Sequence, residues 1–123
     1  MGKFVIRNVA SGMKFDLRAG NGETILTSEV YETMAACRRG ISSVRKNAPG
    51  AKLEDQTQAG HQTLSHPKFE MYPDKAGNYR FRLKARNGQI IAVSDSYATK
   101  AGCLNGIESV RHNAPLADII TEE

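Results

Sequence analysis

The sequence contains no long hydrophobic run. Its longest apolar segments span only a few residues, such as Ile90–Val93, whereas a membrane-spanning helix needs roughly 18. The N-terminal segment MGKFVIRN also lacks the apolar stretch and cleavage site of a signal peptide, and Ile6 stands where an N-myristoylation signal has Ser or Thr. We therefore expect a cytoplasmic protein that makes no membrane contact.

Residues typical of catalysis and metal binding are scarce. Two cysteines, Cys37 and Cys103, lie far apart, and the three histidines His61, His66 and His112 show no metal-ligand spacing. The sequence has no Walker loop, no GxSxG elbow and no GxGxxG fingerprint. We therefore expect no metal, no cofactor and no enzymatic activity.

Composition is that of a folded domain with a mildly basic charge. The 123 residues are 40% hydrophobic and 24% charged, and the formal net charge is +4. This length suits one ordinary domain or two very small ones. The positive charge favours contact with anionic ligands or nucleic acid without specifying either.

The main feature of the sequence is an internal repeat. Residues 43–49 are SVRKNAP and residues 109–115 are SVRHNAP, and a shift of 66 positions makes 16 of the 29 residues in 21–49 identical to those in 87–115. Upstream, KFDLRAGNG matches RFRLKARNG at the same shift. We therefore expect a first repeat over 1–57, a linker over 58–66 and a second repeat over 67–123, paired as one pseudo-twofold domain.

Each repeat has the pattern of three strands, a helix and a last strand. Apolar residues alternate in the segments 14–19 and 79–86, which predicts half-buried strands. The Asn-Gly pairs that follow favour a type I′ hairpin turn. Further strands are expected over 3–9, 24–29, 51–57, 68–72, 89–95 and 118–122.

The helix pattern comes next in each repeat. Apolar residues spaced by four, three and four begin at Cys37 and again at Cys103, so both thiols should face the core. Thr33 and Thr99 are the expected N-caps. The Asn-Ala-Pro ending predicts a helix stop with a left-handed Asn. Mid-helix Gly40 and Gly106 indicate a close approach of helix to sheet.

The expected fold is α+β: two β-β-β-α-β repeats that share one antiparallel sheet, with both helices on one face. The recurring elements F-x-L-x-A-x-NG-x-x-I, S-x-x-Y and GI-x-SV-R-x-NA closely resemble the YegP family of small bacterial proteins over nearly the whole chain. The resemblance implies one continuous sheet in which the repeats exchange their C-terminal strands. It implies no activity, cofactor or catalytic residue.

One strand face is a candidate anion-binding surface. Arg80, Arg82, Lys84 and Arg86 alternate with the core residues of one strand. On the sheet face away from the helices they could form a cationic stripe with Lys14 and Arg18, and such stripes bind phosphates. The carboxylates of Asp16 and Glu70 weaken this expectation, and the alternative is a solvated surface that discourages aggregation.

Two further sets of residues recur in both repeats. Arg45 and Arg111 lie near the helix ends, where a cation complements the helix dipole. Each is also expected to pair with Glu29 or Asp95, and the alternative is that the two arginines bind a ligand. Tyr31 and Tyr97 precede the helices, as do Ser28 and Ser94, which are expected to serve the turn backbone.

Three functions remain open from the sequence. The first is a non-enzymatic module that binds an anionic ligand, such as nucleic acid, or another protein on the open sheet face. The second is a protein–protein adaptor. The third is an enzyme whose site lies between the repeats and uses Arg45, Arg111, Tyr31 or Tyr97. We expect a monomer, because the duplicated chain can satisfy its own pairing.

Overall fold

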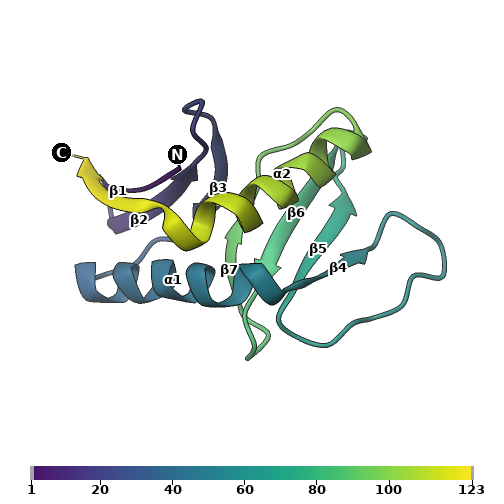
Figure 1. Ribbon diagram of the computed structural model, residues 1–123, viewed down its shortest axis with the longest axis horizontal. Coiled ribbons are helices and arrows are strands. Elements are labelled where there is room, and N and C mark those ends of the chain that lie inside the picture. The colour runs from purple at the N-terminus through teal and green to yellow at the C-terminus, as the bar shows by residue number, and fades with distance from the viewer. Residues whose placement is uncertain (1, 123) are drawn as a thin grey trace.

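A computed structural model describes residues 2–122 and shows the same elements in both repeats (Figure 1). The first repeat consists of β1 (Lys3–Val9), β2 (Gly12–Arg18), β3 (Thr24–Ser28), α1 (Met34–Asn47) and β4 (Lys52–Asp55). The second consists of β5 (Lys68–Pro73), β6 (Tyr79–Lys84), β7 (Ile90–Val93), α2 (Lys100–Asn113) and β8 (Asp118–Glu122). Residues 56–67 form a long loop between them. No helix in the described part of the chain is long and apolar enough to cross a membrane.

The hairpin turns differ from the expected type. In the first repeat the Gly22 N–H donates to the Ala19 carbonyl at 2.9 Å. Among residues 2–122 only glycines have a positive φ, which is 88° at Gly22. A type I′ turn would need positive φ at Asn21 as well. The register in which β2 pairs with β3 shifts between Leu17 and Arg18. The loop therefore has one more residue than the two-residue Asn-Gly turn implies, and Gly22 occupies its left-handed position.

The helices begin as expected and end differently. The Thr33 hydroxyl accepts a hydrogen bond from the Ala36 N–H at 3.1 Å, and Thr99 does the same for Gly102 at 3.0 Å. Asn47 stays right-handed, with φ −91°, and α1 tightens into a 3₁₀ turn (Ala48–Gly50) that contains Pro49. Proline is tolerated in a first helical turn because its missing N–H has no intrahelical partner there. The predicted left-handed Asn is therefore wrong, although the helix stop is confirmed.

The eight strands form one sheet in the order β4-β5-β6-β7-β3-β2-β1-β8. The repeats meet where β3 pairs with β7, and each gives its last strand to the other: β4 lies beside β5, and β8 lies beside β1. These two exchanged pairs are parallel, so the sheet is mixed rather than wholly antiparallel. A strand that arrives through a helical crossover can join an edge in the parallel sense, which a short hairpin cannot achieve.

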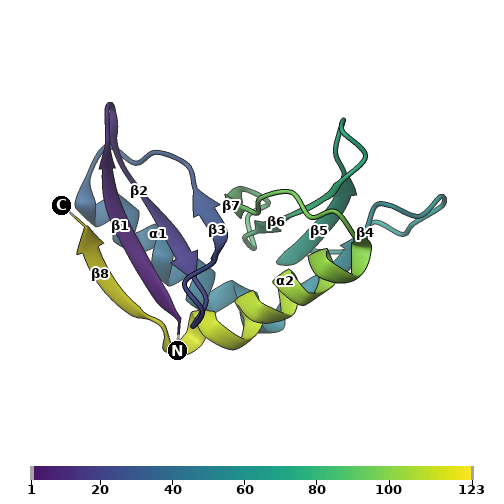
Figure 2. The same ribbon diagram turned by 90° about the horizontal axis from the view of Figure 1, so that it is seen from above.

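Both helices pack on one face of this sheet (Figure 2). Helix α1 contacts β2 and β7, and α2 contacts β6 and β3, so each helix bridges the two repeats. The core between helices and sheet includes Phe4, Phe15, Phe69 and Phe81, which are fully buried. Cys37 and Cys103 also face this core, as their helical spacing predicts. The other face of the sheet carries the alternate side chains of each strand.

Candidate anion-binding site

The predicted cationic row lies on the sheet face away from the helices, but carboxylates pair with most of it. Arg82 Nε lies 2.6 Å from a Glu70 carboxylate oxygen, and Lys84 Nζ lies 3.2 Å from the same carboxylate. Arg80 Nε lies 3.3 Å from Asp74, which belongs to the preceding turn. The Arg82 guanidinium also lies over the Tyr72 ring, 4.6 Å from its centroid. The charge of this row is therefore largely compensated.

A buried ion-pair network continues from this row. Lys68, which is 3% exposed, has its Nζ 2.7 Å from Glu54 and 3.0 Å from Glu70. The long loop closes over it, because the Leu64 N–H donates to Glu54 at 2.7 Å. Burial alone would raise the pKa of Glu54, but hydrogen bonds from Lys68, Gln56 and the Leu64 N–H lower it to about 2. These contacts indicate a structural network rather than a free binding site.

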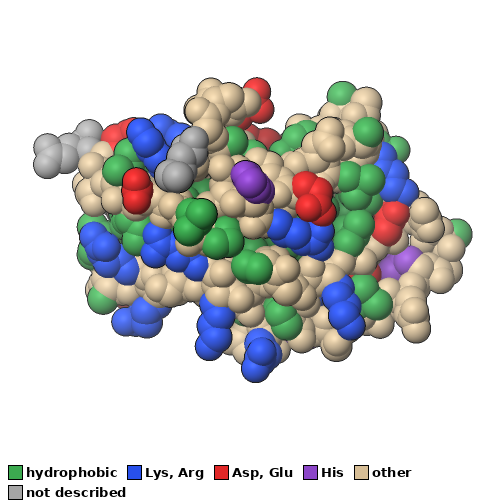
Figure 3. Space-filling model, viewed as in Figure 1, with side chains coloured by type: hydrophobic (Ala, Val, Ile, Leu, Met, Phe, Trp, Pro, Cys, Tyr) green, Lys and Arg blue, Asp and Glu red, His purple; other side chains and the backbone are tan. Residues whose placement is uncertain are grey.

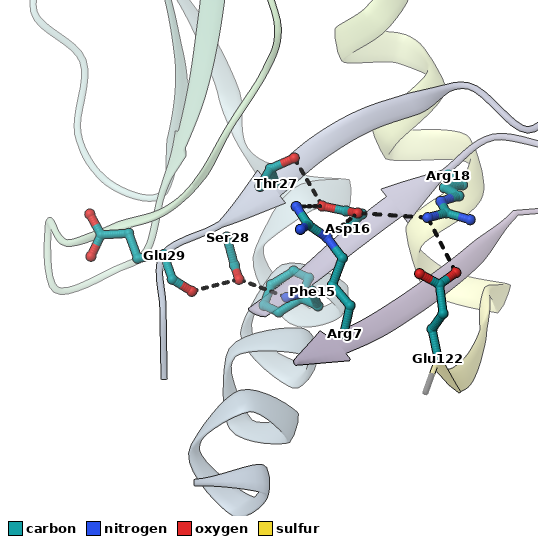
Figure 4. A network of polar contacts seen from close by, with 8 residues as sticks. All are labelled: Arg7, Phe15, Asp16, Arg18, Thr27, Ser28, Glu29 and Glu122. Carbon is teal, nitrogen blue, oxygen red and sulfur yellow. Dashed lines mark hydrogen bonds and ion pairs between the residues drawn. The ribbon is translucent and has the colours of Figure 1, made fainter. Parts of the chain in front are cut away.

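The first repeat has a smaller network on the same face (Figure 4). The buried Asp16 carboxylate accepts from Arg7 Nε at 2.9 Å and from the Thr27 hydroxyl at 3.0 Å. Arg18 lies 3.9 Å from Asp16 and 3.7 Å from Glu122 on the exchanged strand β8. Lys14 lies on the same face of β2. Arg18 is thus held between two carboxylates.

Arg45 and Arg111 support the strand exchange. Arg45 Nη2 donates to the Ala117 carbonyl, and Arg111 Nη2 donates to the Ala51 carbonyl at 2.7 Å. Ala117 and Ala51 directly precede the exchanged strands β8 and β4. Each guanidinium also lies over a buried ring, Arg45 over Phe4 at 5.4 Å and Arg111 over Phe69 at 5.2 Å. The expected pairing with Glu29 or Asp95 is not formed among residues 2–122.

The other repeated polar groups also have structural partners. The Ser28 hydroxyl accepts from the Phe15 N–H at 2.9 Å and donates to the Glu29 carbonyl at 2.8 Å, which is the backbone role predicted for it, and Ser94 repeats this (Figure 4). Burial raises the pKa of the Cys37 thiol, and it raises that of Cys103 to about 11 with help from Asp55. Both thiols stay protonated at neutral pH. The described residues include no group of three possible metal ligands.

A cationic groove lies on the helix side of the molecule. We call it the α1 groove: Arg39, Ser42, Ser43, Lys46 and Asn47 of α1 line a hollow of about 450 Å³ together with Ala85, Arg86 and Asn87 of the β6–β7 turn. No carboxylate lines it, and within residues 2–122 none of its three cations forms an ion pair. In Figure 3, Lys and Arg side chains gather along the lower part of the face, over α1, with no acidic side chain among them. Arg86, predicted for the open face, therefore belongs to this groove.

The equivalent positions in the second repeat do not carry this charge. The shift of 66 positions replaces Arg39 with Asn105, Ser42 with Glu108, Lys46 with His112 and Arg86 with Gly20. Glu108 pairs with Arg111 at 2.5 Å, and Gly2 lies against Asn113 in this region. The two helices therefore differ in charge at equivalent positions. The periodicity of the strands could not identify Arg39 and Lys46, but their divergence between otherwise similar repeats is a signal in the sequence.

Comparisons with known proteins identify the family. The model of a domain of unknown function, DUF1508, matches residues 10–55 and again 74–120. The UPF0339 protein YegP of Yersinia pestis is 38% identical over 114 residues, which cover 92% of this chain and 88% of that protein. A UPF0339 protein of Methanosarcina acetivorans is 62% identical over 56 residues, covering 46% of this chain and 97% of that protein.

A solved structure supports the same assignment. The solution NMR structure of yegP from E. coli aligns with a TM-score of 0.80 at 34% identity, and the alignment covers 98% of this chain and 92% of that one. This agreement confirms the α+β fold and the tandem repeat, and the expected resemblance is confirmed with it. With both copies of the domain matched in order, the chain belongs to the DUF1508 (UPF0339) family, to which YegP also belongs.

Proposed function

We propose that the protein is a small non-enzymatic binding module that takes an anionic ligand in the α1 groove. The observation that carries this proposal is the convergence of Arg39, Lys46 and Arg86 on one hollow that no carboxylate lines. Guanidinium groups bind phosphates and carboxylates through paired N–H donors, and the Ser42 and Ser43 hydroxyls add further hydrogen-bonding groups. The free, buried thiols fit the cytoplasmic location that we propose for it.

The α1 groove is a better site than the open sheet face because its charge is available. A ligand on the open face would compete with Glu70 and Asp74 for Arg80 and Arg82. Removing a guanidinium from a buried carboxylate would cost free energy that ligand binding must first recover. In the α1 groove the cations are exposed, so a ligand displaces only water when it binds them.

The first test measures binding of inorganic phosphate by NMR titration of the backbone amides. Arg86→Gln and Arg39→Gln should each weaken phosphate binding about tenfold, which corresponds to the loss of roughly 1.4 kcal/mol. Arg80→Gln is the matched control, because it removes the same charge from a side chain that is 41% exposed on the opposite face. We expect it to leave phosphate affinity unchanged.

Two outcomes would contradict the proposal. If Arg80→Gln weakens binding while Arg86→Gln does not, the ligand binds the open sheet face. If phosphate shifts no amide near α1 or the β6–β7 turn at low salt, the groove is a solvated surface, and a protein partner becomes the better candidate ligand.

A further inference from the structure

Strand β8 forms one end of the sheet, and its outer edge has no partner strand among residues 2–122 (Figure 2). It pairs with β1 on its inner side only, so its other backbone N–H and C=O groups point away from the sheet. Four of its five residues are exposed, and Ile120 is 41% exposed. An edge of this kind can accept a further strand from another chain.

The strand at the other end of the sheet is less open. Strand β4 holds the equivalent place in the first repeat, and the shift of 66 positions aligns Glu54 with Ile120. Glu54 is buried in the ion pair with Lys68, and the loop that follows β4 donates to it from the Leu64 N–H. In β8 an exposed isoleucine stands in place of this buried carboxylate. The two repeats therefore differ in how much of their end strand they expose.

Strand β8 also lacks the features that usually prevent edge pairing. Its sequence, DIITE, contains no proline, glycine or lysine, and it pairs with β1 over five consecutive positions without a bulge. Ile119, Ile120 and Thr121 are β-branched, which favours an extended strand. Its only charges are the carboxylates of Asp118 and Glu122, one on each side of this apolar centre.

The two carboxylates determine which kind of strand fits the edge. They alternate with Ile120 along β8, so all three side chains lie on one sheet face. On the inner side, β1 places a cation opposite each carboxylate and a valine opposite the isoleucine: Lys3 opposite Asp118, Arg7 opposite Glu122 and Val5 opposite Ile120. Within residues 2–122 Asp118 forms no ion pair, and the Glu122 side chain is 52% exposed, with Arg18 at 3.7 Å. Both carboxylates are therefore available to cations on the outer side.

A second copy of this chain does not suit the edge. If two β8 strands paired antiparallel with Ile120 opposite Ile120, Asp118 would lie opposite Glu122 twice. If they paired parallel and in register, each carboxylate would lie opposite its own copy. Like charges directly opposite destabilise a strand pair. A strand with an apolar residue between two cations has complementary charges in either direction, because this pattern reads the same both ways.

We infer that β8 pairs with an extended segment of another protein, and that this segment carries Lys or Arg at the spacing of Asp118 and Glu122 with an apolar residue midway between them. Main-chain hydrogen bonds supply the affinity, the two carboxylates select the cations, and Ile120 packs against the apolar residue. None of these residues lines the α1 groove, so the inference is independent of the proposed function.

The test titrates the intact protein with capped peptides and follows its backbone amides by NMR. One peptide contains Lys-Thr-Val-Thr-Arg, and the other contains Glu-Thr-Val-Thr-Glu. We expect the cationic peptide to shift the β8 amides, to slow their hydrogen exchange, and to bind about tenfold more tightly than the acidic peptide, because both cross-strand charge pairs change sign.

Exchanging the charges of β8 should reverse this preference. The double substitution Asp118→Lys with Glu122→Lys should bind the acidic peptide more tightly than the cationic one. Glu29→Lys with Asp95→Lys is the matched control, because it makes the same change of charge at exposed residues outside β8. We expect the control to keep the preference of the wild type.

Three outcomes would overturn the inference. Equal affinity for the two peptides, or a preference that the charge exchange leaves unchanged, would show that the carboxylates of β8 select nothing. If no β8 amide shifts at about millimolar peptide, the edge accepts no further strand, since even a weak complex of this kind is populated at such a concentration. A dimer of the peptide-free protein whose interface protects the β8 amides would assign the edge to a second copy instead.

Discussion

At the scale of single residues, Lys68 is the most consequential charge in the chain. Its ammonium lies between the carboxylates of Glu54 and Glu70, and all three side chains are almost fully buried. Burial alone would lower the pKa of Lys68, but the two carboxylates outweigh it and raise that pKa, so the amine remains charged. Removing the amine would leave the buried Glu54 carboxylate without its cation, whereas Glu70 would keep Arg82 and Lys84.

We therefore predict that Lys68→Met destabilises the protein by about 3–5 kcal/mol, the range found when one partner of a buried ion pair is removed. Urea unfolding followed by circular dichroism measures this. Lys52→Met is the control, because exposed Lys52 is the cross-strand neighbour of Lys68 on β4, and it should change stability by less than about 0.5 kcal/mol. Equal effects of the two substitutions would show that the network is not a source of stability.

The sequence alone predicts which sheet face carries these charges, but it does not predict which carboxylate pairs with which cation. Alternation along residues 79–86 correctly puts Arg80, Arg82 and Lys84 opposite the core. Their partners Glu70 and Asp74 come from the preceding strand and its turn, so pairing depends on strand register and loop geometry. Arg86 follows the same alternation but lies beyond the end of β6, where the turn directs it to the α1 groove.

At the scale of elements, the helices depend on glycine where they meet the sheet. A Cβ at Gly40 would overlap the Tyr31 hydroxyl and press on Phe15, whose ring stacks with Tyr31. Gly106 has the same relation to Tyr97 and Phe81. The close approach that the mid-helix glycines predicted is therefore confirmed, and the tyrosine is the contact that the sequence did not identify.

We predict that Gly40→Ala destabilises the protein by about 1–3 kcal/mol through overpacking, although alanine is the better helix former. Tyr31→Phe removes the hydroxyl, so Gly40→Ala should cost less in that background than in the wild type. A double-mutant cycle measured by thermal unfolding gives the coupling. A cost that does not change with the hydroxyl would mean that the ring carbons of Tyr31 and Phe15, which also lie close to the added Cβ, are responsible.

Element types could be predicted better than element ends. Strand alternation and the 4-3-4 helix spacing give the order of strands and helices correctly, because burial dictates both periods. The turn type, the conformation of Asn47 and the direction of the exchanged strands could not be derived, because each depends on how neighbouring elements join. The parallel exchanged pairs in particular follow from the whole sheet, not from residues 51–57 or 118–122.

At the scale of the whole molecule, the two repeats hold each other through their last strands. We predict that a protease site introduced at exposed Gly60 in the long loop yields two fragments that remain together on size-exclusion chromatography. Each fragment supplies an edge strand to the other, so neither can complete its own sheet. The free energy of unfolding should depend on protein concentration after the cut. The intact loop holds one repeat at an effective concentration of about millimolar around the other, and the cut removes this effect. Separate elution of the fragments would show that the exchange is weak.

The positions of the first and last strands have a mechanical consequence. Strands β1 and β8 lie side by side and parallel, with Lys3 opposite Asp118 and Arg7 opposite Glu122 (Figure 2). A force that pulls on the N-terminal end of β1 and on the C-terminal end of β8 acts along the strands in opposite directions. Their hydrogen bonds are then loaded in shear and share the force, instead of opening one after another like a zipper. Tension between the chain ends is thus carried by a strand pair that joins both repeats.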